Sequence, residues 1–233
     1  MQTVIKGISS MATRQLLAEL AAAFEKQSGC VVSFESVGGV DAVKRIQAGE
    51  VYDLAVLASD AIDKLMATGN ICAGSRLDLV LSGVAVAVRA GAALPDISSE
   101  DAVRLAVRAA RSISYSTGPS GVALAKLFQR WGIADEIQSR MVQAPPGVPV
   151  ATLVASGQVE LGFQQLSELM HDEGVAVVGP LPPAIQITTT FSAGIPTRAS
   201  PDSSRTEQVR ALLDFMTSPQ TAQAKRRHGM EPA

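Results

Sequence analysis

The sequence has few of the residues on which metal and disulfide chemistry depends. Its 233 residues include two cysteines and two histidines. Cys30 and Cys72 form neither a disulfide framework nor a metal-ligand spacing, and we expect them to be small buried hydrophobic residues near the ends of apolar segments. His171 and His228 have no neighbouring Cys, Asp or Glu pattern with the spacing of metal ligands. We therefore expect neither a metal nor a cofactor.

Long apolar runs and blocks of one charge are also missing. No stretch approaches the roughly 18 apolar residues of a membrane span, so we expect none. The opening residues 1–6 lack the charged and apolar regions of a signal peptide, which predicts a cytoplasmic protein as written, or a periplasmic one if a leader was removed. The formal net charge is −2. Because Lys225–Arg227 end a predicted helix, whose dipole they complement, we expect no nucleic-acid partner.

The usual enzyme motifs are absent as well. The segment Gly118–Val122 approaches the nucleophile motif G-x-S-x-G, but Val122 stands where the second glycine belongs. No G-x-x-x-x-G-K-[ST] loop for phosphate occurs. Whether the protein is an enzyme is left open at this point.

What the sequence does contain is apolar material in two alternating series of strands and helices. Hydrophobic residues make up 47% and charged residues 18% of the chain, enough for sizeable cores. Apolar residues at intervals of three and four predict a helix over 11–27, with Ser10 as N-cap and Gly29 as its end. Further strands are expected at 3–7, 31–36, 53–58, 79–88, 112–115, 159–163 and 185–195. Further helices are expected at 41–48, 99–110, 121–131, 149–156, 165–171, 203–216 and 218–227.

This alternation predicts an α/β fold with a mostly parallel sheet. Two long strands, near 79–88 and 185–195, bracket the second series, so the chain leaves the first lobe and later returns to it. We predict lobe 1 from residues 1–82 plus 194–233 and lobe 2 from residues 83–193. The double crossover is a natural two-stranded hinge.

Glycines and hydroxyl residues gather at the turns from strand to helix. These turns are Ser9–Ser10, Gly38–Gly39, residues 116–121 and residues 145–149. In open α/β sheets ligands settle at such turns, where helix N-termini present unpaired N–H groups that suit an anion. Glycine permits close approach of the backbone, and Ser or Thr adds donors. Each turn alone is equally consistent with an ordinary cap or tight turn, and the recurrence in both lobes favours an anion site.

The chain resembles the type II periplasmic solute-binding proteins, and among them the molybdate-binding family, from Val4 to Met230. The residues that carry the resemblance are Ser9–Ser10, residues 46–50 (IQAGE), 53–56 (DLAV), Ser59–Asp60, the strand Gly83–Val88, Ser120–Gly121, residues 153–157 (LVASG), 160–163 (ELGF) and 212–220 (LLDFMTSPQ). The resemblance implies a two-lobed fold of this type, closure on a small anion between the lobes, and an ABC transporter permease as partner if the chain is exported.

The resemblance also implies a set of ligand-binding residues. Molybdate binders offer serine hydroxyls from the first two turns and a tyrosine from the far lobe. Here Val37–Gly38–Gly39 replaces the second hydroxyl turn and Gln164 stands in place of the tyrosine, which leaves room for a larger di- or tricarboxylate. Gln164 would bond one carboxylate, and Arg14 or Arg45 would approach another. The predicted ligand residues are Ser9, Ser10, Gly38, Gly39, Ser59, Ser116, Thr117, Ser120, Gly121, Val148 and Gln164.

Two alternatives to a transport binding protein remain open. Aconitate isomerase is an enzyme that resembles the same binding-protein family, which implies that this fold can host proton transfer on a tricarboxylate. That chemistry requires a positioned acid or base, and Glu35, Asp41 and Tyr115 are candidates by position. The other alternative is a cytoplasmic ligand sensor, because a chain that is not exported cannot deliver solute from outside.

Overall fold

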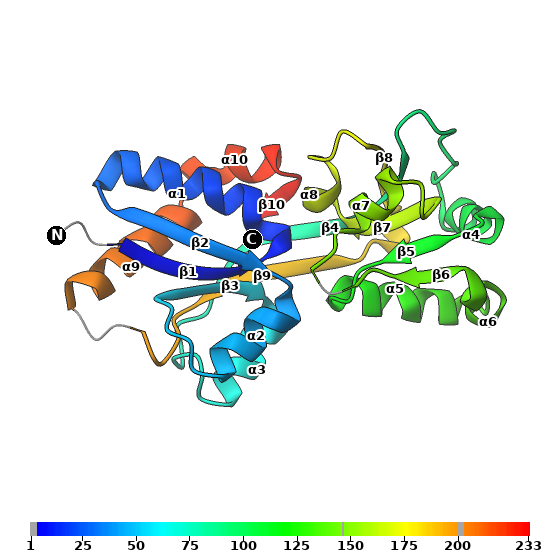
Figure 1. Ribbon diagram of the computed structural model, residues 1–233. Helices are drawn as coiled ribbons and strands as arrows, with labels where there is room; N and C mark the ends of the chain where they lie inside the picture. The colour runs from blue at the N-terminus through cyan, green and yellow to red at the C-terminus, as the bar shows by residue number, and fades with distance from the viewer. Residues whose placement is uncertain (1–3, 146, 200–202) are drawn as a thin grey trace. The chain divides into compact units, whose positions relative to one another are not determined.

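Two compact units make up the chain. The computed structural model describes residues 4–145, 147–199 and 203–233. Unit 1 is Met1–Leu81 with Thr190–Ala233, and unit 2 is Ser82–Thr189. Strands β4 (Leu77–Arg89) and β9 (Thr188–Gly194) each run from one unit into the other (Figure 1).

Unit 1 is a mixed sheet with helices on both faces. Its strands follow the order β2-β1-β3-β9, with β4 next to β9 and β10 paired to β4. Strand β1 is parallel to both β2 and β3, whereas β9 is antiparallel to β3. The remaining elements of this unit are β1 (Val4–Ser10), α1 (Arg14–Ser28), β2 (Val31–Val37), α2 (Gly39–Gln47), β3 (Leu54–Ala58), α3 (Ser59–Ala67), α9 (Ser203–Thr217), α10 (Ala222–Arg227) and β10 (Met230–Pro232), with 3-10 turns at Met11–Thr13 and Pro219–Thr221.

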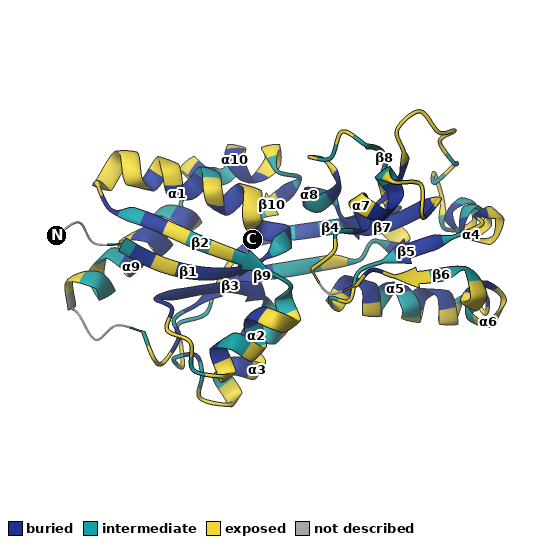
Figure 2. Cartoon of the chain, in the orientation of Figure 1, coloured by how far each residue is buried: buried dark blue, intermediate teal, exposed yellow. Residues whose placement is uncertain are grey.

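Alternation along the strands of unit 1 divides its apolar residues between two cores. Leu54 and Val56 of β3 pack with residues of α1 and α9, whereas Ala55 and Leu57 pack with residues of α2 and α3. Successive side chains of a strand point to opposite faces, so one fully buried strand contributes to both cores. Figure 2 shows β3 buried and the outer faces of the flanking helices exposed.

Unit 2 repeats this plan on a smaller scale. Its strands follow the order β4-β7-β5-β6, with β8 also paired to β4. Strand β5 is parallel to β6 and β7, and β4 is antiparallel to β7 and β8. The elements are α4 (Glu100–Ala109), β5 (Ile113–Tyr115), α5 (Pro119–Arg130), α6 (Ala134–Ile137), β6 (Met141–Gln143), α7 (Val150–Ala155), β7 (Leu161–Gln165), α8 (Leu166–Leu169) and β8 (Val175–Pro180), with 3-10 turns at Gln138–Arg140 and Pro183–Ile185.

The alternating valines and alanines of β4 give the sheet of unit 2 a large hydrophobic core on one face and a small one on the other. Val84, Val86 and Val88 join the larger core with α4, α5 and α6. Ala85 and Ala87 face the other way, in a small cluster with residues of α7 and α8. Because alanine side chains are short, α7 lies close to the sheet on this face. The close approach continues at Gly162 of β7, where a Cβ atom would lie 2.6 Å from Val154 Cγ2 and 2.9 Å from Val150 Cγ1.

The sequence predicts the α/β class correctly, but the sheet is mixed rather than mostly parallel. The long strand β4 runs antiparallel to β7 and β8, and β9 runs antiparallel to β3. Elements missed from the sequence are α3, α6, β6, β8 and β10, most of them short. Four of these elements have three to six residues, and a hydrophobic pattern of that length does not distinguish a strand or a helical turn from a loop. Thr3, where the first strand was predicted to start, lies outside the described residues. Among those described, no helix has the length and apolar character to cross a membrane.

We expect Gly162→Ala to destabilise the protein by about 1–3 kcal/mol, because the added methyl group would force α7 away from β7. The measurement is the free energy of unfolding from chemical denaturation. Gly39→Ala is the matched control, since no heavy atom lies within 4 Å of a Cβ at that position. Equal stabilities of the two variants would contradict the tight packing of α7 on β7.

Candidate functional site

The parallel strands of unit 1 bring three of the predicted turns to one edge of its sheet. Ser9 pairs with Ser36 on one side and Val56 on the other, so β1, β2 and β3 end side by side. Their carboxyl ends lead into Ser10, Gly38–Gly39 and Ser59. The amides of Gly39 and Val40, at the start of α2, make no backbone hydrogen bond within the described residues. These amides are therefore available as hydrogen-bond donors at this edge, as the amides of a helix N-terminus are.

Hydroxyl groups add donors at the same edge. Ser9 Oγ and Ser36 Oγ lie 2.8 Å apart, and because each hydroxyl has one proton, the pair keeps one proton for an outside acceptor. Ser10 is buried and precedes the 3-10 turn Met11–Thr13, but its side chain makes no capping bond. Ser36 was missed in the sequence, where it was counted as part of a strand. Only the register of β1 with β2 identifies it as the partner of Ser9.

The hydroxyl of Ser59 is committed inside unit 1. Ser192 Oγ donates to Asp78 Oδ1 at 2.6 Å, so the proton of Ser59 must serve Ser192 Oγ, at 2.6 Å, or the carbonyl of Thr190, at 3.0 Å. The bond from Ser192, together with Arg76, lowers the pKa of Asp78 and keeps it an acceptor. Ser59 can therefore offer a ligand its backbone amide but no hydroxyl proton.

In unit 2 the turn after β5 carries four of the predicted residues. Ser116 Oγ and Ser120 Oγ lie 3.3 Å apart, a second pair that retains one proton. The hydroxyl of Thr117 has no hydrogen-bond partner among the described residues, and the amides of Thr117 and Gly118 make no backbone bond there. Gly121 is required by sterics, since a Cβ atom would lie 1.9 Å from the Ser116 carbonyl oxygen. The turn thus combines close backbone packing with unused donors.

The last two predicted ligand residues have internal partners. The amide of Val148 donates to the Pro145 carbonyl at 3.0 Å. Pro146, in the same turn, lies outside the described residues. Gln164, near the end of β7, is buried, its Oε1 accepts from the amide of Ala151 at 3.3 Å and its Nε2 donates to Glu168 Oε1 at 2.8 Å. The amide of Gln164 is therefore used to fix α7 and Glu168.

Arg45, expected to approach a ligand carboxylate, is held by carboxylates of its own unit. Its guanidinium donates to both oxygens of Glu35, at 2.6 and 2.9 Å, and to Glu50 at 2.8 Å. Tyr52 donates to the same Glu50 at 2.7 Å. The bonds from Arg45 lower the pKa of Glu35 and of Glu50. Glu35, a candidate for proton transfer, is thus an ionised partner of Arg45.

The other charged or phenolic candidates lie on the same elements as the turns. Arg14 begins α1 and Asp41 lies in the first turn of α2, and both side chains are exposed. Tyr115 ends β5, and its ring lies against Gly121. A Cβ atom added at Gly121 would be 3.1 Å from Tyr115 Cδ2. None of them forms a metal-binding group with other described residues.

Comparison with known proteins assigns the family. The model of the bacterial extracellular solute-binding proteins matches residues 5–231 of the chain. The chain belongs to this family. Its fold is the two-lobed α/β fold of periplasmic solute-binding proteins. The description of the family as extracellular favours the exported alternative and gives no support to a cytoplasmic location.

Two characterised relatives of this solute-binding protein differ in what they do. Aconitate isomerase from a Pseudomonas species is 35% identical over 99% of this chain and 88% of that protein. A molybdate-binding protein from Azotobacter vinelandii is 25% identical over 91% of this chain and 83% of that protein. The solved structure of the periplasmic molybdate-binding protein of the same organism superposes with a TM-score of 0.79 at 23% identity, covering 97% of this chain and 98% of that one. The resemblance to molybdate-binding proteins is thus confirmed.

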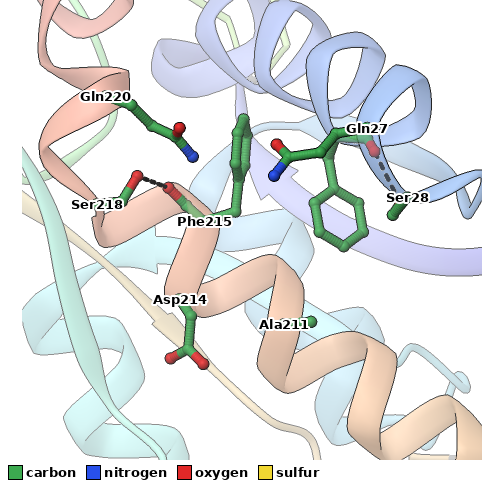
Figure 3. A pocket seen from close by; sticks show the side chains of 8 residues that line it. Gln27, Ser28, Ala211, Asp214, Phe215, Ser218 and Gln220 are labelled. Atoms are coloured by element: carbon green, nitrogen blue, oxygen red, sulfur yellow. Dashed lines mark hydrogen bonds between the residues drawn. The ribbon is translucent and has the colours of Figure 1, made fainter.

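A separate hollow of about 400 Å³ lies in unit 1 between α1 and α9 of the solute-binding protein. Figure 3 shows Phe215 between the side chains of Gln27 and Gln220. Phe215 also contacts Phe24, with 5.6 Å between ring centroids. The charged side chain of its lining is Asp214. Because a carboxylate repels an anion, this hollow does not suit the ligand class that the turns predict.

Glu168 is the second residue that the sequence did not single out. It lies in α8, one turn beyond the end of β7, and burial raises the pKa of its carboxyl to about 7, although the bond from Gln164 lowers it. In the sequence it is a single glutamate four residues after the predicted Gln164, with no motif around it. The carboxyl is desolvated because α7, which precedes α8 in the chain, and β8, which follows it, both pack against α8.

Since the carboxyl of Glu168 has a pKa near 7 in the folded chain and near 4.5 when unfolded, its ionisation opposes folding. The free energy of unfolding therefore falls by up to about 3 kcal/mol as pH rises from about 4.5 to 7. We expect Glu168→Gln to be more stable than the parent at pH 8 and to lose that advantage near pH 4.5. Denaturation at both pH values measures the difference, with the exposed Glu173→Gln as control. A difference that does not change with pH would contradict the assignment.

Proposed function

We propose that this solute-binding protein binds a small organic polycarboxylate through the turns at the carboxyl edges of its sheets. The observation that carries the proposal is a set of donors at these turns that have no partner in the part of the chain that the structure describes. They are the hydroxyls of Ser10 and Thr117 and the amides of Gly39, Val40, Thr117 and Gly118. Ser10 is buried, whereas Val40 and Thr117 are exposed, so a charged acceptor at these turns would take the place of water on the exposed donors.

The donors fit an anion held without a cation. Partial positive charge at the starts of α2, α3 and α5 favours negative charge, and hydrogen bonds to a charged acceptor are about twice as strong as neutral ones. Arg45 is already paired with Glu35 and Glu50, so it does not need to approach the ligand. Uncharged donors also release the ligand more readily than an ion pair would.

A polycarboxylate fits better than molybdate for two reasons. The turn Val37–Gly38–Gly39 lacks the hydroxyl that the molybdate-binding family places there, so there is room for a larger ligand. The relative named for a tricarboxylate, aconitate isomerase, is also more similar to this chain than the molybdate-binding relative is, at 35% against 25% identity. A tricarboxylate such as aconitate or citrate is therefore the first class to test.

The proposal includes a mechanical step and a location. Strands β4 and β9 connect the two units twice, and we take them as the hinge about which the protein closes on its ligand. A closed, liganded form in the periplasm would then deliver the ligand to an ABC transporter permease.

A thermal-shift panel tests the ligand class. We expect trans-aconitate, cis-aconitate or citrate to raise the melting temperature in a concentration-dependent way, because the ligand binds only the folded form. Molybdate, tungstate, sulfate and phosphate should have smaller effects. No change in melting temperature with any anion would refute the proposed function. A response to molybdate alone would show that the ligand is an oxyanion and not a polycarboxylate.

The donors can be tested one at a time by titration calorimetry. Ser10→Ala and Thr117→Val should each weaken tricarboxylate binding roughly tenfold or more, since each removes a hydrogen bond to a charged acceptor. Ser33→Ala is the control, because Ser33 is exposed in the middle of β2, away from the turns. Unchanged affinity in both test variants would remove these turns from the site.

Isomerisation of a tricarboxylate is the second candidate, favoured by 35% identity to aconitate isomerase over 99% of the chain. It requires a positioned acid or base. The pairing of Glu35 with Arg45 makes Glu35 a weak base, which leaves Asp41 and Tyr115 of the residues expected from the sequence. Incubation with trans-aconitate, followed by chromatography for cis-aconitate, decides between the two functions. Binding without conversion would exclude the isomerase.

A further inference from the structure

Glu168 and Gln164 form an oriented pair at the carboxyl edge of unit 2. Gln164 Oε1 accepts a hydrogen bond from the amide of Ala151, so its Nε2 must face Glu168. Nε2 donates to Glu168 Oε1 at 2.8 Å. Oε1 is therefore always an acceptor. When Glu168 carries a proton, the proton is on Oε2.

The oxygen Oε2 has no partner within the described residues. Among the described residues, the fully enclosed side-chain atoms without a hydrogen bond are Ser114 Oγ, Ser167 Oγ and Arg205 Nε. Glu168 Oε2 is not one of them, so it is not fully enclosed. The residue as a whole is partly exposed, although its carboxyl is desolvated by its surroundings. Oε2 therefore keeps an open direction in which a ligand atom can approach.

No charge on the packed elements balances this carboxyl. Helix α8 packs against α7, β7 and β8. None of these elements contains a titratable side chain, and Glu168 is the titratable residue of α8. Along the chain, α8 is followed by His171, Asp172 and Glu173, and Asp172 accepts a bond from the amide of Gly174. Burial without a cation explains why the pKa of Glu168 rises to about 7.

The position of the pair matches that of the other donors. Tyr115 of β5 lies beside Phe163 of β7, and the two parallel strands end at the same edge. The turn 116–121 follows one strand, and Gln164, Gln165 and α8 follow the other. A donor on Oε2 therefore belongs to the same edge of unit 2 as Thr117.

We propose that protonated Glu168 donates a hydrogen bond from Oε2 to a carboxylate of the bound ligand, so that ligand binding takes up a proton. The inference rests on the proposed function and adds a residue that selects for ligand charge. Neutral Glu168 is a donor without a positive charge, whereas ionised Glu168 repels an anionic ligand. The proton comes from solvent and returns to solvent on release, and no covalent bond changes.

Titration calorimetry with propane-1,2,3-tricarboxylate, which has no double bond to shift, tests the inference. Its carboxyl groups are essentially ionised from about pH 7 to about pH 9, because ordinary carboxyl pKa values lie near 4 and like-charge repulsion raises the last of the three by roughly one to two units. We expect the affinity of the parent protein to fall about tenfold per pH unit above pH 7. Measurements near pH 7 in two buffers of different ionisation enthalpy should show net proton uptake.

Two variants separate this role from a structural one. Glu168→Gln keeps a donor and the shape but cannot titrate, so its affinity should be independent of pH and its binding should take up no proton. Glu173→Gln, an exposed carboxyl four residues beyond α8, should behave like the parent. Tricarboxylate binding by the parent with a flat pH profile would overturn this inference alone. No tricarboxylate binding by the parent at any pH would overturn the proposed function, and the inference with it.

Discussion

Parallel pairing of short strands constrains where the candidate ligand-binding turns of this protein lie. In unit 1 the pairing of β1 with β2 and β3 ends three strands at one edge, and in unit 2 the pairing of β5 with β6 and β7 does the same. Each of these strands must turn before a helix can pack back on the sheet, so the first amides of the helices gather at that edge. The hydroxyls of Ser10 and Thr117 lie there for the same reason. Small residues then permit the close approach, as Gly121 does against the Ser116 carbonyl.

The polar groups behind these turns are arranged so that most are satisfied from within. Asp78, Ser192 and Ser59 form a chain in which each proton has an acceptor, and this chain joins β4, β9 and α3 in unit 1. Glu35, Arg45, Glu50 and Tyr52 form a second closed group. At the candidate turns, the groups without a protein partner among the described residues include neutral donors, such as the hydroxyls of Ser10 and Thr117 and the first amides of α2. Such dipoles would support the proposed anion site without Arg45, whose guanidinium is held by Glu35 and Glu50.

Similarity to an isomerase and to a molybdate-binding protein is a natural consequence of this design. Orphan amides and hydroxyls recognise negative charge in general, and the side chains around them decide its shape. We propose that Val37–Gly38–Gly39 in place of a hydroxyl turn, and Gln164 in place of a tyrosine, change the ligand, while the fold remains that of the family. Gln164 is informative because its amide is spent on Ala151 and Glu168. A position that the family uses for a ligand contact here orients a neighbouring acid.

Much of this protein was determined by the sequence itself. The periodicity of residues 11–27, the valine and alanine alternation in β4 and the glycines before the helices are local patterns, and they predict the α/β class, the two series of elements and the turns of the candidate site. Tertiary structure alone decided which of those turn residues keep a proton to give. The partner of Ser9 is Ser36, that of Ser59 is Ser192 and that of Gln164 is Glu168, and two of these pairs are more than 25 residues apart. Hydrogen bonding and desolvation depend on what lies across the sheet, and that information is not contained in the spacing of residues along the chain.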